Sequence, residues 1–476
     1  MKIIFYIWAF LERFGTNVVS LLGYIVLSYL LNPEDFGLVS MTAIFTSLIY
    51  VFVDCGLSDG LLREKKPANS DFNTLFFFNL AIGAVLAFVF FAISAPVAQY
   101  FGHPEIRGIM IAFGSLAVLS GLTISQIAKL RSQLQFKKIA AINISSTFLA
   151  LAVAIGMAYA GLRYWALVEL QLGYLFFYLV FLLFFSKWNL KPEFDVARFK
   201  QLWAFGVNLL FSTFVTQISQ NIFTFILGKF YNPAQAGYMG QAQKLQQAPT
   251  NSLENSISIT SYTLIAKKET AAEKRDAIIT AFGLMTLTNA LLCALLLAVS
   301  KPLITVIFPQ KWLPVIPYLN LMLAWALIYP VNNFMMIIFK LFNKTSIIRN
   351  VLVLEKCGII VVALLLYPLG VPAMICGAIA LSILSFCLYS AAAQRVASVP
   401  YLSFFRIFAA NIAVPLMATA VAFAATQLIS SAIVALIVGT GVFLVTASLL
   451  VKFLRAKYYS LILSQVRSLL NHKTGS

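Results

Sequence analysis

Charged residues are scarce in this sequence of 476 residues. They make up 11% of the chain, whereas 61% of the residues are hydrophobic and the mean hydropathy is +0.90. Soluble globular domains carry about 25% charged residues, so the composition excludes that class and predicts a polytopic membrane protein. Histidine is rarer still, since the chain has only His103 and His472, which lie too far apart in sequence for a metal site. The five cysteines lie in apolar runs without metal-ligand spacing, so we expect small buried side chains and no metal site.

Long polar stretches are also few, and the apolar runs between them have the length of membrane crossings. Residues 1–15 contain a short apolar run that ends in Glu12 and Arg13 without a small-residue cleavage site. We therefore expect this segment to stay in the mature chain as an interfacial lead-in, not to be removed as a signal peptide. The expected fold class is an all-α integral membrane protein. Taking about 20 apolar residues as one crossing, the sequence predicts about fourteen spans, at residues 14–31, 37–58, 73–99, 107–128, 139–160, 164–186, 202–228, 235–262, 278–299, 315–339, 347–367, 371–393, 405–427 and 432–451.

Acidic residues number 16 against 34 Lys and Arg, which gives a net charge of +18. A basic patch of that size would indicate a nucleic-acid partner. Most of the basic residues lie in one alternate set of connections, however, and the other set holds only Arg107, Arg163, Lys229, Lys301 and Lys311. Basic residues are enriched in the cytoplasmic connections of membrane proteins, so both termini are expected in the cytoplasm. Topology thus explains the charge, and we expect no nucleic-acid partner.

Two short motifs recur at corresponding loops and indicate an internal repeat. Asn-Pro-x-x-x-Gly begins at Asn32, between the first and second spans, and again at Asn232, between the seventh and eighth. Ser-x-Pro begins at Ser94 and again at Ser300, where the third and ninth spans end. A unit of six spans returns the chain to its starting side, so the two copies are expected to be parallel repeats.

The repeat divides the chain into four predicted parts. Residues 1–198 form an N-terminal six-helix lobe and residues 199–400 a C-terminal six-helix lobe, with a central cavity between them. Residues 401–452 are the two helices outside the repeat. Residues 453–476 read as an amphipathic helix on the cytoplasmic leaflet, attracted by anionic membrane lipids, although a solvated tail is the alternative.

One predicted span is polar on one side, and the rest of the interpretation depends on it. At 100° per residue, eight polar side chains of residues 241–258 fall on an arc of roughly 160° of a helix. A charge near the bilayer centre costs at least ~2.5 kcal/mol, so the arc has to face protein or water. It is either the wall of a hydrated substrate cavity or a hydrogen-bonded seam between helices. The arc contains Gln241, Gln243, Lys244, Gln247, Asn251, Glu254, Asn255 and Ser258.

The spans related by the repeat also carry polar faces. Arg13, Asn17 and Tyr24 share a side of the first span, and Gln217 and Gln220 share a side of the seventh. The economical arrangement is a cleft lined by the first helices of each lobe. These residues, with Gln241, Lys244, Gln247, Asn251 and Asn255 of the polar arc, are the candidate substrate-binding residues.

Ionisable residues within predicted spans are candidates for function because burying them in a membrane is costly. We select Asp54, Glu254 and Glu355 as candidate ion-coupling residues. Structural alternatives stay open for each of them, and Asp54 in particular could simply end its helix. Glu355 and Lys356 are adjacent, point about 100° apart on a helix, and are expected to need separate partners.

Several segments resemble the Wzx-type polysaccharide flippases of the multidrug/oligosaccharidyl-lipid/polysaccharide exporter superfamily, closest to the colanic-acid-exporter-like branch. They lie in the first three quarters of the chain: LLNPEDFGLVSM from Leu30, DCGLSDGLLREK from Asp54, LRSQLQFKKIAAI from Leu130, YNPAQAGYMGQAQKL from Tyr231 and FPQKWLPVIPYL from Phe308.

The resemblance implies two six-helix bundles around a cavity and alternating access. It implies a transporter without catalytic residues or a cofactor, which carries an undecaprenyl-diphosphate-linked oligosaccharide across the bacterial inner membrane, driven by a proton or sodium gradient. Its partners would include a polysaccharide polymerase and a chain-length regulator. The arc at 241–258 is less cationic than expected for a diphosphate site, so Arg13, Arg63 or Lys129 at the cytoplasmic mouth could hold that group. The alternatives are a multidrug or cation antiporter of the same superfamily and a membrane polysaccharide polymerase or ligase.

Overall fold

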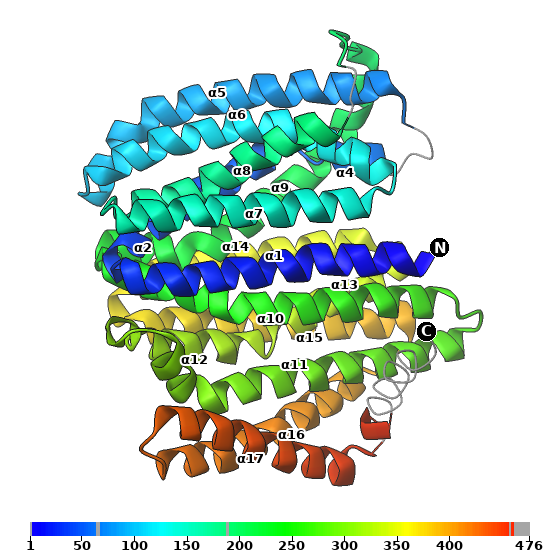
Figure 1. Ribbon diagram of the computed structural model, residues 1–476. Helices are drawn as coiled ribbons and strands as arrows, with labels where there is room; N and C mark the ends of the chain where they lie inside the picture. Colours follow the sequence, from blue (N-terminus) through cyan, green and yellow to red (C-terminus); the bar gives the residue numbers. More distant parts are fainter. Residues whose placement is uncertain (1, 63–66, 187–189, 457, 461–476) are drawn as a thin grey trace. The chain divides into compact units, whose positions relative to one another are not determined.

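The computed structural model describes residues 2–62, 67–186, 190–456 and 458–460, and gives only the backbone of residues 2–14, 17, 59, 205, 208 and 209. Every secondary-structure element within these ranges is a helix (Figure 1). The all-α fold class is therefore confirmed. The helices are α1 (Lys2–Leu30), α2 (Pro33–Met41), α3 (Ala43–Asp54), α4 (Leu57–Leu62), α5 (Asn69–Phe101), α6 (Glu105–Ser132), α7 (Phe136–Tyr159), α8 (Trp165–Phe185), α9 (Val196–Phe230), α10 (Pro233–Ala266), α11 (Ala271–Ile307), η1 (Gln310–Trp312), α12 (Val315–Ala326), α13 (Tyr329–Leu341), α14 (Thr345–Leu366), η2 (Tyr367–Leu369), α15 (Val371–Ala397), α16 (Tyr401–Gln427) and α17 (Ala432–Leu454).

Twelve helical segments of the described chain are long and apolar enough to cross a membrane. They correspond to twelve of the fourteen predicted spans. The other two are α1, whose described apolar part is the shorter segment Val18–Leu30, and α10, which is long enough but too polar. The chain is a multi-pass membrane protein, and the crossing of the bilayer by α1 and α10 stays a prediction.

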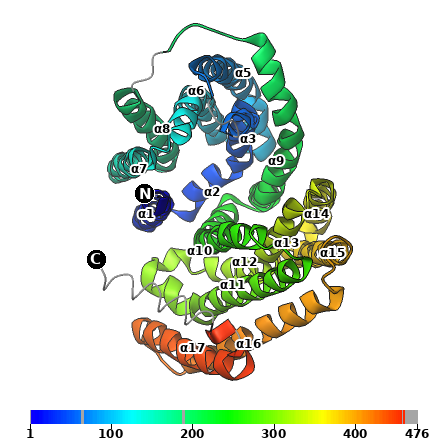
Figure 2. The ribbon, with the colours of Figure 1, turned by 90° about the vertical axis from the view of Figure 1, so that its right-hand side faces the viewer.

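The helices group into two compact units. Unit 1 comprises Met1–Gln241 and Ala363–Tyr367, and unit 2 comprises Ala242–Val362 and Pro368–Ser476. Within unit 1, α5 packs along α6, α7 packs along α8 and α1, and α9 lies against α3 and α5 (Figure 2). Within unit 2, α11 packs against α16 and α17, and α15 packs against α12 and α13. The lobe boundaries expected from the repeat stay a prediction.

The two copies of the Asn-Pro-x-x-x-Gly motif contact each other within unit 1. A Cβ atom on Gly37 would lie 1.8 Å from the carbonyl oxygen of Pro233, and one on Gly237 would lie 2.1 Å from the carbonyl oxygen of Pro33. Both contacts need glycine, because any side chain would overlap the backbone of the other copy. The contact is reciprocal, as it is at a two-fold axis.

The second predicted span, 37–58, is not one helix as expected. It is interrupted at Thr42, whose hydroxyl donates to the carbonyl of Val39 at 2.8 Å, and again at Cys55 and Gly56. These last two residues have φ of 49° and 73°, the left-handed conformation that ends a right-handed helix. Asp54 then accepts a hydrogen bond from the N–H of Ser58 at 3.2 Å and so caps the start of α4.

The tenth predicted span, 315–339, is also divided, into α12 and α13. Pro330 has no N–H, so it cannot bond to the carbonyl of Ala326 as a helix requires. The Asn289 side chain on α11 donates to that carbonyl at 2.8 Å instead. A freed carbonyl satisfied in this way is what allows proline within membrane helices.

Polar side chains of α16 form hydrogen bonds to α11 within unit 2. The Asn411 amide donates to the carbonyl of Gly283 and to the hydroxyl of Thr286, both at 2.8 Å. The Thr419 hydroxyl donates to the carbonyl of Ala294 at 2.9 Å. The tail predicted at 453–476 lies largely outside the described residues, but Tyr458 is described and buried, with its hydroxyl against Gly283.

Candidate substrate site on helix α10

Helix α10 begins at a well-formed cap and runs for 34 residues. The Asn232 side chain accepts a hydrogen bond from the N–H of Gln235 at 2.8 Å, and Pro233 occupies the first helical position. Pro249 lies inside the helix without ending it. The polar arc predicted from the sequence therefore lies on one continuous helix, most of it in unit 2.

One side of α10 is hydrogen-bonded to α13 within unit 2. The Tyr329 hydroxyl accepts a hydrogen bond from the Gln246 amide at 3.1 Å and donates to the Asn251 side chain at 3.2 Å. The Gln246 amide also donates to the Thr250 hydroxyl at 2.7 Å. Gln246 and Thr250 are buried, so these bonds satisfy groups that would otherwise be costly in the interior.

The same seam continues one turn further along both helices. The Asn333 amide on α13 donates to the Glu254 carboxylate at 3.2 Å. The sequence left open whether the polar arc is a seam or a cavity wall, and this side of α10 is a seam. Gln246, Thr250, Tyr329 and Asn333 were not among the predicted site residues. The cluster Tyr329, Asn332 and Asn333 in an otherwise apolar span was the available signal.

The neighbouring side of α10 is polar and exposed. Lys244, Asn251 and Asn255 lie on it, together with Ser252 and Ser256. The Ser252 hydroxyl donates to the carbonyl of Ala248, and that of Ser256 donates to the carbonyl of Ser252, both at 2.8 Å. A hydroxyl that donates in this way keeps its oxygen lone pairs for a ligand. We call Lys244, Asn251, Ser252, Asn255 and Ser256 the open face of α10.

Two other predicted residues of α10 are less accessible. Gln247 is half-buried, and Gln241 is only 2% exposed. Neither amide atom of Gln241 has a hydrogen-bond partner. Gln241 therefore does not lie on the open face, and a substrate role for it stays a prediction.

The candidate residues of unit 1 lie on α1 and α9. Tyr24 is half-buried, with its ring centroid 6.4 Å from that of Phe36, Gln217 is half-buried and Gln220 is exposed. Arg63 lies outside the described residues, and the side chains of Arg13 and Asn17 are also outside the description. Their roles stay predictions.

The candidate acids have different surroundings. Asp54 is the last residue of α3, as in the structural alternative, and also caps α4, whereas Glu355 on α14 is buried and pairs with Lys356 at 3.0 Å. The expectation that Glu355 and Lys356 need separate partners is wrong, because the long lysine side chain reaches back to its neighbour. Among the described residues, no three His, Cys, Asp or Glu side chains are grouped to hold a metal ion. Cys357 and Cys376 are exposed, not buried as expected.

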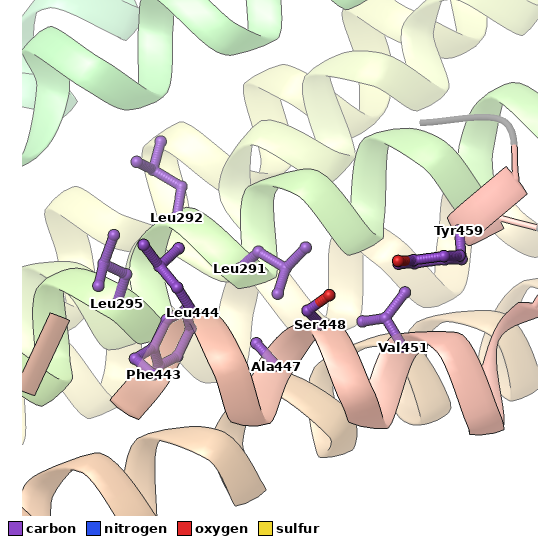
Figure 3. A pocket seen from close by; sticks show the side chains of 9 residues that line it. All are labelled: Leu291, Leu292, Leu295, Phe443, Leu444, Ala447, Ser448, Val451 and Tyr459. Carbon is purple, nitrogen blue, oxygen red and sulfur yellow. The ribbon is translucent and has the colours of Figure 1, made fainter. Parts of the chain in front are cut away.

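A separate pocket of about 300 Å³ in unit 2 is lined by α11, α17 and Tyr459 (Figure 3). Its lining is apolar apart from Ser448 and the Tyr459 hydroxyl. It includes none of the candidate residues.

Solved structures of a flippase and of a multidrug transporter have a similar arrangement of helices. The fold is similar to that of the lipid II flippase MurJ in an inward closed conformation, with a TM-score of 0.70 at 14% identity over 95% of this chain and 99% of that one. It is also similar to an inward-facing multidrug resistance MATE family transporter, with a TM-score of 0.62 at 11% identity over 82% and 96% of the chains. The fold is therefore similar to that of MurJ and of MATE transporters.

The sequence identifies the family within that fold. Residues 26–317, more than half of the chain, match the family model described as "Polysaccharide biosynthesis protein". The chain belongs to this polysaccharide biosynthesis family, which confirms the resemblance drawn from its motifs.

Curated relatives are distant. The chain is 24% identical to the teichuronic acid biosynthesis protein TuaB of Bacillus subtilis, over 66% of each protein. It is 22% identical to the lipopolysaccharide biosynthesis protein WzxC of Escherichia coli, over 65% of this chain and 63% of that protein. The matched region thus spans just under two thirds of these relatives.

Proposed function

We propose that this protein is a flippase for undecaprenyl-diphosphate-linked oligosaccharide repeat units. It would move them from the cytoplasmic to the periplasmic leaflet of the bacterial inner membrane by exposing its substrate site alternately to the two sides. Both termini would lie in the cytoplasm. A polysaccharide polymerase and a chain-length regulator would act on the units after transfer.

The open face of α10 is the observation that carries this proposal. Amides and hydroxyls both donate and accept hydrogen bonds, as sugar hydroxyls do, and α10 presents Asn251, Ser252, Asn255 and Ser256 in an otherwise apolar chain. The single cation of the face, Lys244, is a candidate contact for a phosphate oxygen or a sugar acid. The lipid tail needs no polar site, because it can stay in the bilayer.

The proposed energy source is a proton or sodium gradient, with Glu254 and Glu355 as the residues that bind the coupling ion. A bound cation neutralises the charge of a carboxylate. This shifts the equilibrium between the two conformational states of the transporter only if the free energy of cation binding differs between those states. Glu254 is suited to this because it bonds to Asn333 beside the open face. Asp54 is a weaker candidate because it already caps a helix.

Deleting the gene and reconstituting the protein test the function. We expect the deletion to accumulate lipid-linked repeat units in the cytoplasmic leaflet, and purified protein in vesicles to transfer them. Export of cationic dyes, abolished by Glu254→Gln, would instead indicate a multidrug antiporter. Normal transfer with a failure of chain growth would indicate a polymerase or ligase.

Lys244→Ala is expected to lower repeat-unit transfer about tenfold, the loss expected when one charge-assisted hydrogen bond to the substrate is removed. Surface polysaccharide and the amount of protein in the membrane should be measured together. Lys268→Ala, which removes an exposed lysine just after α10, is the matched control. Unchanged transfer would remove Lys244 from the site.

Glu254→Gln is expected to abolish the stimulation of transfer by an ion gradient. Glutamine keeps an acceptor oxygen for Asn333 but cannot ionise, so the seam should persist while the charge is lost. The measurement is transfer in vesicles with and without an imposed proton or sodium gradient. A full response to the gradient would show that Glu254 has no coupling role.

A further inference from the structure

A buried charge pair in unit 2 is tied to a neighbouring helix through one hydroxyl. Glu355 on α14 accepts a hydrogen bond from Lys356 at 3.0 Å and one from the Ser382 hydroxyl on α15 at 3.4 Å. The glutamate side chain is 2% exposed. A change in the charge of Glu355 therefore acts first on Lys356 and Ser382.

Ser382 links the pair to α12. The Trp325 indole N–H donates to the Ser382 hydroxyl at 3.0 Å. An indole can only donate, so when Ser382 accepts from Trp325 its proton points away, toward Glu355. The Asn332 amide on α13 donates to the carbonyl of Ser382 at 2.8 Å and holds this part of α15 in place.

Trp325 in turn contacts Tyr329 across the interruption between α12 and α13. Their ring centroids are 5.7 Å apart. The backbone here is held by short-range turns, in which the N–H of Ile328 bonds to the carbonyl of Trp325. The helix is interrupted at Leu327 and Ile328, next to Pro330, where an intrahelical hydrogen bond is missing. The two rings therefore lie where we expect α12 and α13 to change their angle.

Tyr329 completes the connection to the open face of α10. Its hydroxyl donates to the exposed Asn251 at 3.2 Å and accepts from Gln246 at 3.1 Å. One continuous series of contacts thus runs from the buried Glu355 through Ser382, Trp325 and Tyr329 to Asn251.

We propose that Trp325 and Tyr329 are positioning residues that transmit the charge state of the Glu355–Lys356 pair to Asn251 on the open face. Neutralising or displacing the charge of Glu355 reorients the Ser382 hydroxyl and releases the Trp325 indole. Tyr329 then shifts at the helix interruption and changes the placement of Asn251. This inference rests on the proposed function, because Asn251 is taken to contact the glycan and Glu355 to sense the ion.

Transfer of an undecaprenyl-diphosphate-linked oligosaccharide into vesicles tests the inference, measured with and without an imposed proton or sodium gradient. Tyr329→Phe removes only the hydroxyl, and Trp325→Phe removes the indole N–H. We expect each variant to reduce the ratio of driven to undriven transfer by up to about tenfold, the effect of one lost hydrogen bond. Undriven transfer should change much less. The double variant should be no worse than the more severe single variant, because both residues lie on one path.

Matched controls separate this effect from general damage. Tyr459→Phe makes the same change in the apolar pocket of unit 2, and Trp203→Phe makes it on the exposed surface of α9. Both should keep the wild-type ratio. A wild-type ratio in Tyr329→Phe and Trp325→Phe, or strictly additive losses in the double variant, would overturn the inference. A wild-type protein that transfers no lipid-linked oligosaccharide would instead overturn the proposed function.

Discussion

Replacing Gly37 with alanine is expected to lower the melting temperature of the detergent-purified protein and its yield in the membrane. The new methyl group would lie 1.8 Å from the carbonyl oxygen of Pro233, which is backbone and cannot move aside as a flexible side chain would. Overpacking of this kind costs ~1–3 kcal/mol or more. Gly237→Ala is expected to behave similarly, because its methyl group would meet the carbonyl of Pro33 at 2.1 Å.

Two other helical glycines provide controls for the alanine change. Cβ atoms on Gly156 and Gly441 would meet no atom within 4 Å. Gly156→Ala and Gly441→Ala should therefore be neutral or slightly stabilising, since alanine is favoured over glycine in a helix by about 1 kcal/mol. Equal melting temperatures for all four variants would show that the two motifs do not pack as described.

Lys356→Ala is expected to destabilise the protein by ~3–5 kcal/mol, because removing one partner of a buried ion pair leaves the other charge uncompensated. Only the weaker contact from Ser382 would remain on Glu355. The measurement is the amount of folded protein recovered from membranes, together with its melting temperature.

Removing both charges should recover much of that loss. In Glu355→Gln combined with Lys356→Met, no charge is buried and the methionine fills the space of the lysine stem, so the double variant should be more stable than Lys356→Ala. Lys344→Met, at an exposed position just before α14, serves as the control. A double variant as unstable as Lys356→Ala would show that the pair stabilises the protein through side-chain packing and not through its charges.

Hydropathy predicted the all-α membrane fold because crossing a bilayer requires about 20 apolar residues in succession. That signal does not depend on how the helices pack. The interruptions were missed for the same reason: Thr42 and the turn at Leu327 and Ile328 lie inside apolar runs and do not alter them. The repeat was visible because Asn32 and Asn232 begin the same short motif, but the contact between its copies is visible only in three dimensions.

The polar arc of α10 was predicted more completely than its partners. Helical periodicity places Asn251, Glu254 and Asn255 near one another, since they are neighbours on the same helix. Periodicity cannot predict the contacts with Tyr329 and Asn333, because these residues belong to a helix nearly eighty residues later in the chain. It also failed for Glu355 and Lys356, because the direction of a Cβ atom does not limit where a flexible lysine side chain ends.

The seam between α10 and α13 has a consequence for how the protein enters the membrane. Hydropathy alone does not favour releasing α10 into lipid, since it is absent from the twelve sufficiently apolar helical segments. Its polar groups bond to Tyr329 and Asn333, which the ribosome adds much later. We therefore expect α10 to stay at the insertion machinery or against other helices until α13 has been synthesised. The predicted membrane insertion of α10 would then depend on the assembly of unit 2.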